Sequence, residues 1–172
     1  MEFYESLRNA IIQQAINDYS NAVKKIMYLN DGIRARDEII KNGLKRQTPK
    51  QYTFEEAEKE RVDRIKIAQG RLHEVENFFL SSWYKTICTI DCEYMLKMTK
   101  EKAIDDMVKK CILLLKEVDE KNFNSAKSKK AIEDYETLKL FLQSEWLEQF
   151  TEKTSEYYIG KIKRESNIPE KY

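Results

Sequence analysis

The sequence predicts an all-α fold: a bundle of about six helices, built as two similar helix corners. Apolar residues recur every three or four positions over long stretches, which is typical of amphipathic helices. Only four Gly and two Pro occur among 172 residues, so the chain has few turn-forming points. No segment alternates polar and apolar residues, so no sheet is expected. We expect one domain, residues 1–172, with lobes at 1–118 and 119–172.

Each helix is predicted from its apolar stripe. In the first, Leu7, Ile11, Ala15 and Tyr19 share one face. Glycines at positions 32 and 43 are expected to end the first two helices, because glycine readily ends a helix. The expected helices lie at about 3–29, 33–42, 53–88, 92–118, 127–150 and 155–166.

Three helix starts carry N-capping residues, whose side-chain oxygens accept from the free backbone N–H groups of a first turn. Thr53 and Glu56 form the pattern of a capping box, in which each side chain bonds the other residue's backbone. Asp91 is expected to cap the helix that begins at Cys92. Thr154 is expected to cap the last helix.

Two segments of the chain resemble each other at a spacing of about 63 residues, with roughly a quarter of positions identical. The first contains Phe78, Ser81, Trp83, Glu93 and Tyr94. The matching positions in the second are Phe141, Ser144, Trp146, Glu156 and Tyr157. Duplication and chance both remain open explanations.

The repeated segment is interpreted as a helix corner. Trp83 and Trp146 are expected to be buried and to fix the angle between two helices, because an indole buries a large area. Tyr94 is expected to fold back against Trp83. The capped breaks at Asp91 and Thr154 would form the turns.

Composition excludes several classes of function. The 31 basic and 30 acidic residues leave a net charge of +1, which gives no general attraction to nucleic acid or to an anionic membrane. No apolar run is long enough to span a bilayer, and the first residues do not read as a signal peptide. Three cysteines, an odd number, favour the reducing cytoplasm.

The residue types that carry enzyme chemistry are scarce. His73 is the only histidine, which removes most transition-metal sites. The sequence contains neither a Gly-x-Ser-x-Gly elbow nor a glycine-rich phosphate loop. We therefore predict no catalytic residues, no metal, no cofactor and no enzymatic activity.

Binding residues are more plausible. Lys45, Arg46 and Lys50 cluster in the first long loop with Tyr52, and an aromatic residue in a basic loop can stack on a base. Tyr157 and Tyr158 form a second candidate patch, because tyrosine is favoured at interfaces. A further basic cluster surrounds the second loop and contains Lys121, Lys127, Lys129 and Lys130, with Phe123 nearby.

Two stretches, Leu7–Ile26 and Val75–Glu101, resemble a group of small helical proteins carried by prophages and integrative elements of Firmicutes. That group has an Ala-Ile-rich helix ending in Asp-Tyr, then Phe-Phe-x-Ser-x-Trp, then Asp-Gly-Glu-Tyr-Leu-Ile. The matching residues are Asp18, Tyr19, Phe78, Phe79, Ser81, Trp83, Asp91, Glu93 and Tyr94. Cys92 departs from the pattern where glycine is expected, so the turn there can differ.

The resemblance implies an accessory protein of a mobile element in the bacterial cytoplasm. Its expected action is to bind and inhibit or redirect a bacterial protein or nucleoprotein complex, and anti-CRISPR inhibitors are one such class. The alternative is a helical nucleic-acid-binding protein of a replication or transfer module. Salt dependence separates the two, because phosphate contacts weaken steeply with added salt.

Overall fold

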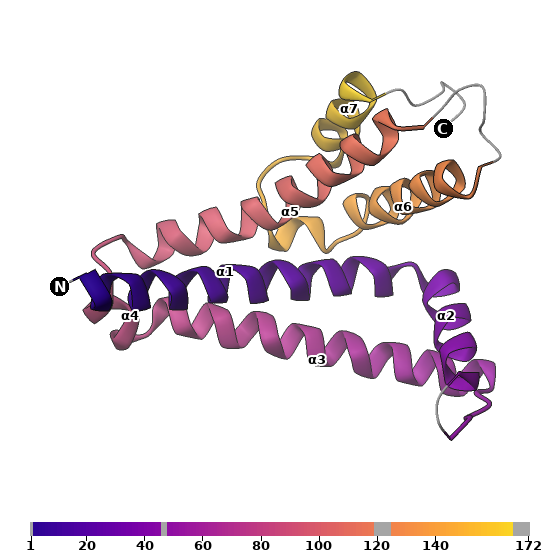
Figure 1. The fold of residues 1–172 in the computed structure, drawn as a ribbon, viewed down its shortest axis with the longest axis horizontal. Coiled ribbons are helices and arrows are strands. Elements are labelled where there is room, and N and C mark those ends of the chain that lie inside the picture. The colour runs from indigo at the N-terminus through magenta and orange to yellow at the C-terminus, as the bar shows by residue number, and fades with distance from the viewer. Residues whose placement is uncertain (1, 46–47, 119–124, 167–172) are drawn as a thin grey trace. The chain divides into compact units, whose positions relative to one another are not determined.

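The computed structural model describes residues 2–45, 48–118 and 125–166, with side chains from residue 4 onward. Within these ranges helices are the only regular secondary structure, without strands (Figure 1), which confirms the predicted all-α class. The elements are α1 (Glu2–Asn30), α2 (Gly32–Leu44), α3 (Phe54–Leu80), α4 (Ser82–Ile87), α5 (Cys92–Lys116), α6 (Ala126–Leu142), the 3-10 turn η2 (Leu147–Gln149) and α7 (Ser155–Glu165).

The chain divides into two compact units. Unit 1 comprises Met1–Lys100 and unit 2 comprises Glu101–Tyr172. The division therefore falls inside α5, whereas the expected lobe boundary lay after this helix, between residues 118 and 119.

Unit 1 is built on an antiparallel pair of long helices, α1 and α3 (Figure 1). The Tyr19 hydroxyl donates to Glu76 Oε1 at 3.3 Å, and Arg61 Nη1 donates to the Leu29 carbonyl at 2.7 Å. Glu76 also pairs with Lys100 at 2.9 Å, which ties the start of α5 to α3. Burial of one large apolar side chain contributes about 1.5–3 kcal/mol, so the buried faces of α1 and α3 dominate the stability of this unit. These faces contain Tyr19, Val23, Ile26, Ala68, Leu72 and Phe79.

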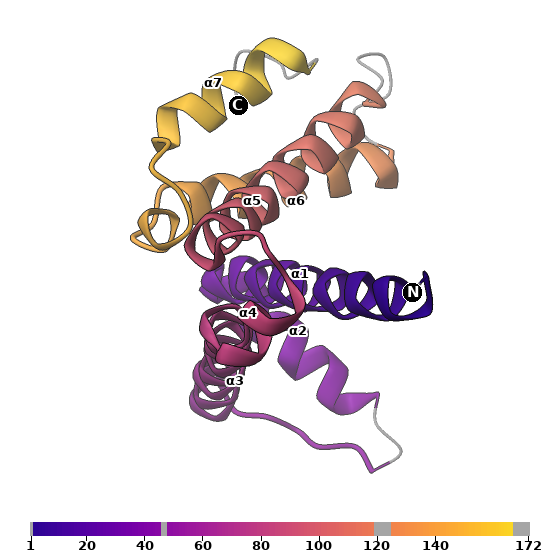
Figure 2. The ribbon, with the colours of Figure 1, turned by 90° about the vertical axis from the view of Figure 1, so that its left-hand side faces the viewer.

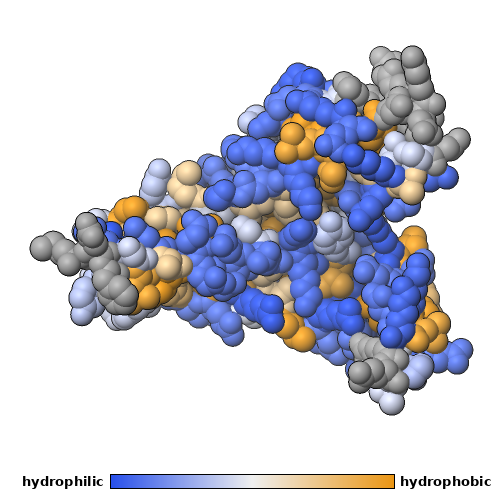
Figure 3. Space-filling model, viewed as in Figure 1, coloured by the Kyte–Doolittle hydropathy of each residue, from blue (hydrophilic) through white to orange (hydrophobic). Residues whose placement is uncertain are grey.

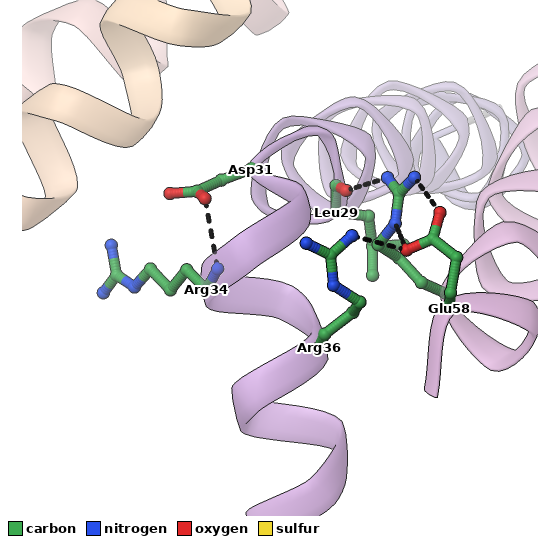
Figure 4. A network of polar contacts seen from close by, with 6 residues as sticks. Leu29, Asp31, Arg34, Arg36 and Glu58 are labelled. Atoms are coloured by element: carbon green, nitrogen blue, oxygen red, sulfur yellow. Dashed lines mark hydrogen bonds and ion pairs between the residues drawn. The ribbon is translucent and has the colours of Figure 1, made fainter. Parts of the chain in front are cut away.

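A shared carboxylate joins α2 to α3 where α1 ends (Figure 4). Glu58 accepts from Arg61 Nη2 at 2.6 Å and Nε at 3.0 Å, and from Arg36 Nη1 at 2.7 Å. Because Arg61 also bonds the Leu29 carbonyl, this network connects three helices. These hydrogen bonds hold the pKa of Glu58 well below its usual range, at about 2.

The loop after α2 folds back onto that helix. Lys50 N donates to the Gly43 carbonyl at 3.0 Å, and Tyr52 packs with Ile39 and Ala57 in a small apolar cluster. A Cβ on Gly43 would lie 2.5 Å from the Lys50 carbonyl oxygen and 2.6 Å from the Tyr52 ring. Glycine is therefore required at this position by the close approach of the loop.

Unit 2 contains the rest of α5, then α6, η2 and α7. Ile104, Val108, Cys111 and Leu115 form the buried face of α5, at a spacing of three or four residues. Burial raises the pKa of the Cys111 thiol to about 12, as expected for a structural cysteine. The other buried faces contain Tyr135, Leu138, Phe141 and Leu142 of α6 and Tyr158 and Ile162 of α7.

Candidate partner-binding surface

The expected helix over residues 53–88 is interrupted at Ser81. The Ser81 hydroxyl donates to the Phe78 carbonyl at 2.7 Å and accepts from the Tyr84 N–H at 3.2 Å. It thereby ends α3 and caps α4, and its extended backbone separates the two helices. Serine does this readily because its short side chain competes for nearby backbone groups.

The interruption changes which aromatic residue faces inward. The predicted burial of Trp83 is wrong: its side chain is 46% exposed, whereas its neighbour Tyr84 is fully buried. The prediction extended the α3 stripe across Ser81, but α4 begins a new helix with its own phase. Burial also raises the pKa of Tyr84, as it does for phenols removed from water.

The exposed indole of Trp83 packs against other aromatic rings. The Trp83 ring lies 5.5 Å from that of Phe78, and Phe78 lies 5.2 Å from Phe79 and 5.8 Å from Tyr84. Phe79 and Tyr84 are fully buried and contact edge to face at 5.4 Å. Trp83 is thus a large amphipathic side chain fixed on a rigid base, with part of its surface open to solvent.

The turn into α5 adds more exposed apolar surface. Asp91 accepts from the Tyr94 N–H at 2.8 Å, which confirms it as the N-cap of α5. The prediction that Tyr94 folds back against a buried Trp83 is wrong, because Tyr94 is 58% exposed. Tyr94 and Met98 lie four residues apart on α5, so they are neighbours on one face of that helix, and Ile90 lies in the turn just before it.

We call the exposed apolar residues around this turn the corner patch. They come from the end of α3, from α4 and from the start of α5, all within unit 1. Figure 3 shows hydrophobic surface at the end of unit 1 where α1 begins and α4 lies. Sequence reasoning found Trp83 and Tyr94 but missed the other three, although the Ser81-Ser82 pair inside an apolar stripe was a signal for the break. The corner patch consists of Leu80, Trp83, Ile90, Tyr94 and Met98.

The second copy of the repeated segment uses the same turn. Ser144 Oγ donates to the Phe141 carbonyl at 2.7 Å, just as Ser81 does to Phe78, and α6 ends there. The residues that follow form the short turn η2, and Trp146 is half-buried. The predicted burial of Trp146 as an angle-fixing residue is therefore only partial, because the helix ends before reaching it.

The two adjacent tyrosines near the start of α7 differ in their exposure to solvent. Thr154 accepts from the Tyr157 N–H at 3.3 Å, which confirms it as the N-cap. Tyr157 is half-exposed, in keeping with its predicted role in partner binding, and that role stays a prediction. Tyr158 is fully buried, so its predicted contact with a partner is wrong; its place on the inner face of α7 makes it a core residue.

The first basic loop is also changed by packing. Lys45 and Lys50 are exposed, while Arg46 lies outside the described residues. Tyr52 is buried against α2, so the predicted base-stacking role of this residue is wrong. The Lys50 ammonium lies 4.3 Å from the Tyr52 ring centroid, a cation–π contact that fixes the lysine next to α2. The partner-binding roles of Lys45 and Lys50 remain predictions.

A metal site finds no support in the described part of the chain. This part contains no cluster of three or more His, Cys, Asp and Glu side chains arranged to hold a metal ion. Cys88 and Cys92 are free and partly exposed on either side of the corner turn. None of the described helices has the length and apolar character needed to cross a membrane.

Comparison with protein-family models, with curated proteins and with solved structures produced no match to this chain. The proposed function therefore rests on the geometry of the corner patch. The patch combines an exposed indole, supported by other aromatic rings, with exposed apolar residues at the start of the next helix.

Proposed function

We propose that the protein acts by binding, and that the corner patch of unit 1 seats against an apolar surface of a partner protein. One observation carries the proposal: Trp83 is 46% exposed on a base of packed aromatic rings. Tryptophan and tyrosine are enriched among the few residues that dominate binding energy at interfaces. A rigid support lowers the entropy that is lost when such a side chain is fixed by a partner.

The rest of the patch suits the same role. Tyr94 and Met98 lie one helical turn apart, so a partner that contacts one can contact the other. Aromatic residues and methionine are enriched in interface cores. Asp91 caps the helix that presents Tyr94 and Met98, so the patch is preorganised in the free protein.

We further propose that the partner is a bacterial protein or nucleoprotein complex, and that the protein is an accessory factor of a phage or mobile element. The resemblance noted above supports this setting, since the stretch Val75–Glu101 includes the whole corner patch. Binding would block or redirect the partner sterically, without catalysis. An inhibitor of a bacterial defence system, such as an anti-CRISPR protein, is one form that this activity can take.

The test is capture of the partner from bacterial extract, followed by affinity measurement with purified proteins. We expect Trp83→Ala and Tyr94→Ala each to weaken binding by about 30-fold, the effect of losing about 2 kcal/mol at a hot spot. Ile67→Ala is the matched control, because Ile67 is also exposed in unit 1 but lies on α3 away from the corner. Wild-type affinity in both corner variants would contradict the proposal, as would capture that nuclease treatment abolishes.

A further inference from the structure

The total charge of the chain is near neutral, but unit 2 contains a strongly basic region. We call this region the basic end. It is formed where α5 ends, α6 begins and α7 ends. Residues 109–117, 125–130 and 161–165 contain nine basic residues and two acidic ones, Glu117 and Glu165. The basic end consists of Lys109, Lys110, Lys116, Lys127, Lys129, Lys130, Lys161, Lys163 and Arg164.

The fold brings the end of α7 toward the two other segments, which are close to each other in sequence. Lys127 Nζ lies 2.7 Å from a carboxylate oxygen of Glu117, which joins the start of α6 to the chain just after α5. In both Figure 1 and Figure 2, α7 runs toward the end of unit 2 where α5 finishes and α6 starts. Eight of the nine basic side chains are exposed, and Lys161 is partly buried.

Helix electrostatics explains only part of this arrangement. Cations in the last turn of a helix interact favourably with its dipole, which accounts for Lys116, Lys163 and Arg164. Lys127, Lys129 and Lys130 lie in the first turns of α6, where the dipole disfavours cations and the first turn itself holds no acidic residue. Lys127 is paired with Glu117, whereas the side chains of Lys129 and Lys130 are exposed to solvent.

The opposite end of unit 2 is nearly balanced in charge. Lys153 lies 3.6 Å from Glu101 and 3.8 Å from Asp105, and Lys102 pairs with Asp106 at 2.8 Å. The excess positive charge of unit 2 therefore lies toward the end of α5. Such separation orients a polyanion toward one end of the unit as it approaches.

We infer that the basic end of unit 2 binds the phosphate backbone of a nucleic acid, without reading its sequence. Regularly spaced phosphates are the multivalent anion that fits nine cationic side chains spread over three helix ends, and lysines act there as point charges. This site is independent of the corner patch. Together the two sites would suit a target that contains both protein and nucleic acid.

The experiment measures binding of a short labelled DNA duplex of arbitrary sequence to the full chain by fluorescence anisotropy. We expect the affinity to fall at least 100-fold between about 50 and 200 mM salt, as for complexes with several phosphate contacts. Lys129→Gln combined with Lys130→Gln should weaken binding at least about tenfold and make the salt slope shallower by about two.

Two controls make the result specific. Lys66→Gln combined with Lys102→Gln removes the same charge from exposed positions outside the basic end and should leave DNA affinity unchanged. Trp83→Ala should also bind DNA like the wild type, so failure of the corner-patch proposal is separable from failure of this one. The inference would be overturned if the duplex does not bind at low salt, if both double variants weaken it equally, or if polyglutamate peptide binds as well as DNA.

Discussion

Substituting Glu58 by Gln tests the network that joins three helices of unit 1. The change keeps the size of the side chain but removes the charge that Arg36 and Arg61 share. The amide retains one carbonyl acceptor, so at most part of the three hydrogen bonds to Glu58 can persist. Arg61 would still donate to the Leu29 carbonyl, so the helices should remain docked but less firmly.

The magnitude follows from the pKa of Glu58. Its fall from the ordinary value of 4.5 to about 2 in the folded protein corresponds to about 3 kcal/mol at most. The carboxylate side chain is 33% exposed, and solvent screening reduces the effect of such pairs. We therefore expect Glu58→Gln to lower the free energy of unfolding by about 1.5 kcal/mol at neutral pH.

The pH dependence has a defined sign. Because the folded-state pKa of Glu58 lies below its unfolded value, its ionised form stabilises the fold fully above pH 4.5. That contribution is lost as the pH falls from 4.5 toward 2, when the carboxylate becomes protonated in the folded state. The difference between the wild type and the variant should shrink over the same window.

Urea unfolding followed by far-ultraviolet circular dichroism provides the assay, at neutral pH and at about pH 3. Glu60→Gln is the matched control, since Glu60 lies on the same helix and, in the described part of the chain, pairs with Arg64 at 2.9 Å across one turn. That partly exposed pair should contribute less than about 0.5 kcal/mol. The reasoning is refuted if Glu58→Gln and Glu60→Gln have equal effects, or if the Glu58 effect is as large at acid pH as at neutral pH.

Five further substitutions test individual packing claims by the same unfolding assay. Gly43→Ala should destabilise by about 1–2 kcal/mol, because the added methyl meets the Lys50 carbonyl, whereas Gly70→Ala should stabilise by up to about 1 kcal/mol, because the space beside it is open. Tyr135→Phe should be neutral or slightly stabilising, since its buried hydroxyl has no hydrogen-bond partner in the described part of the chain; a loss above about 1 kcal/mol would contradict this. Tyr158→Ala should cost about 3–5 kcal/mol and Tyr157→Ala much less, and equal losses would show that Tyr158 is not in the core.

Features that depend on residues close in sequence were predicted well. The capping box of Thr53 and Glu56 forms as expected, with hydrogen bonds of 2.9 and 3.2 Å. Asp91 and Thr154 also cap the helices assigned to them. A cap involves partners only three residues apart, so its geometry follows from the local sequence whatever the rest of the fold does.

Features that depend on helix phase or on distant packing were predicted poorly. Ser81 interrupts a stripe that otherwise reads as continuous, and a break of one residue rotates every later side chain about the helix axis. Trp83 was for that reason assigned to the core in place of Tyr84. The burial of Tyr52 depends on Gly43 and Ile39, which lie on the helix before the loop, and no local pattern around the tyrosine indicates that contact.

The most direct test of the account concerns Trp83, because the proposed binding surface depends on its exposure. Trp146→Phe leaves Trp83 as the only indole, so acrylamide quenching of the remaining fluorescence reports on that side chain alone. We predict red-shifted, readily quenched emission from the free protein, and protection of that emission when the captured partner is added. Blue-shifted emission that resists quenching in the free protein would contradict the account, and so would quenching that the bound partner leaves unchanged.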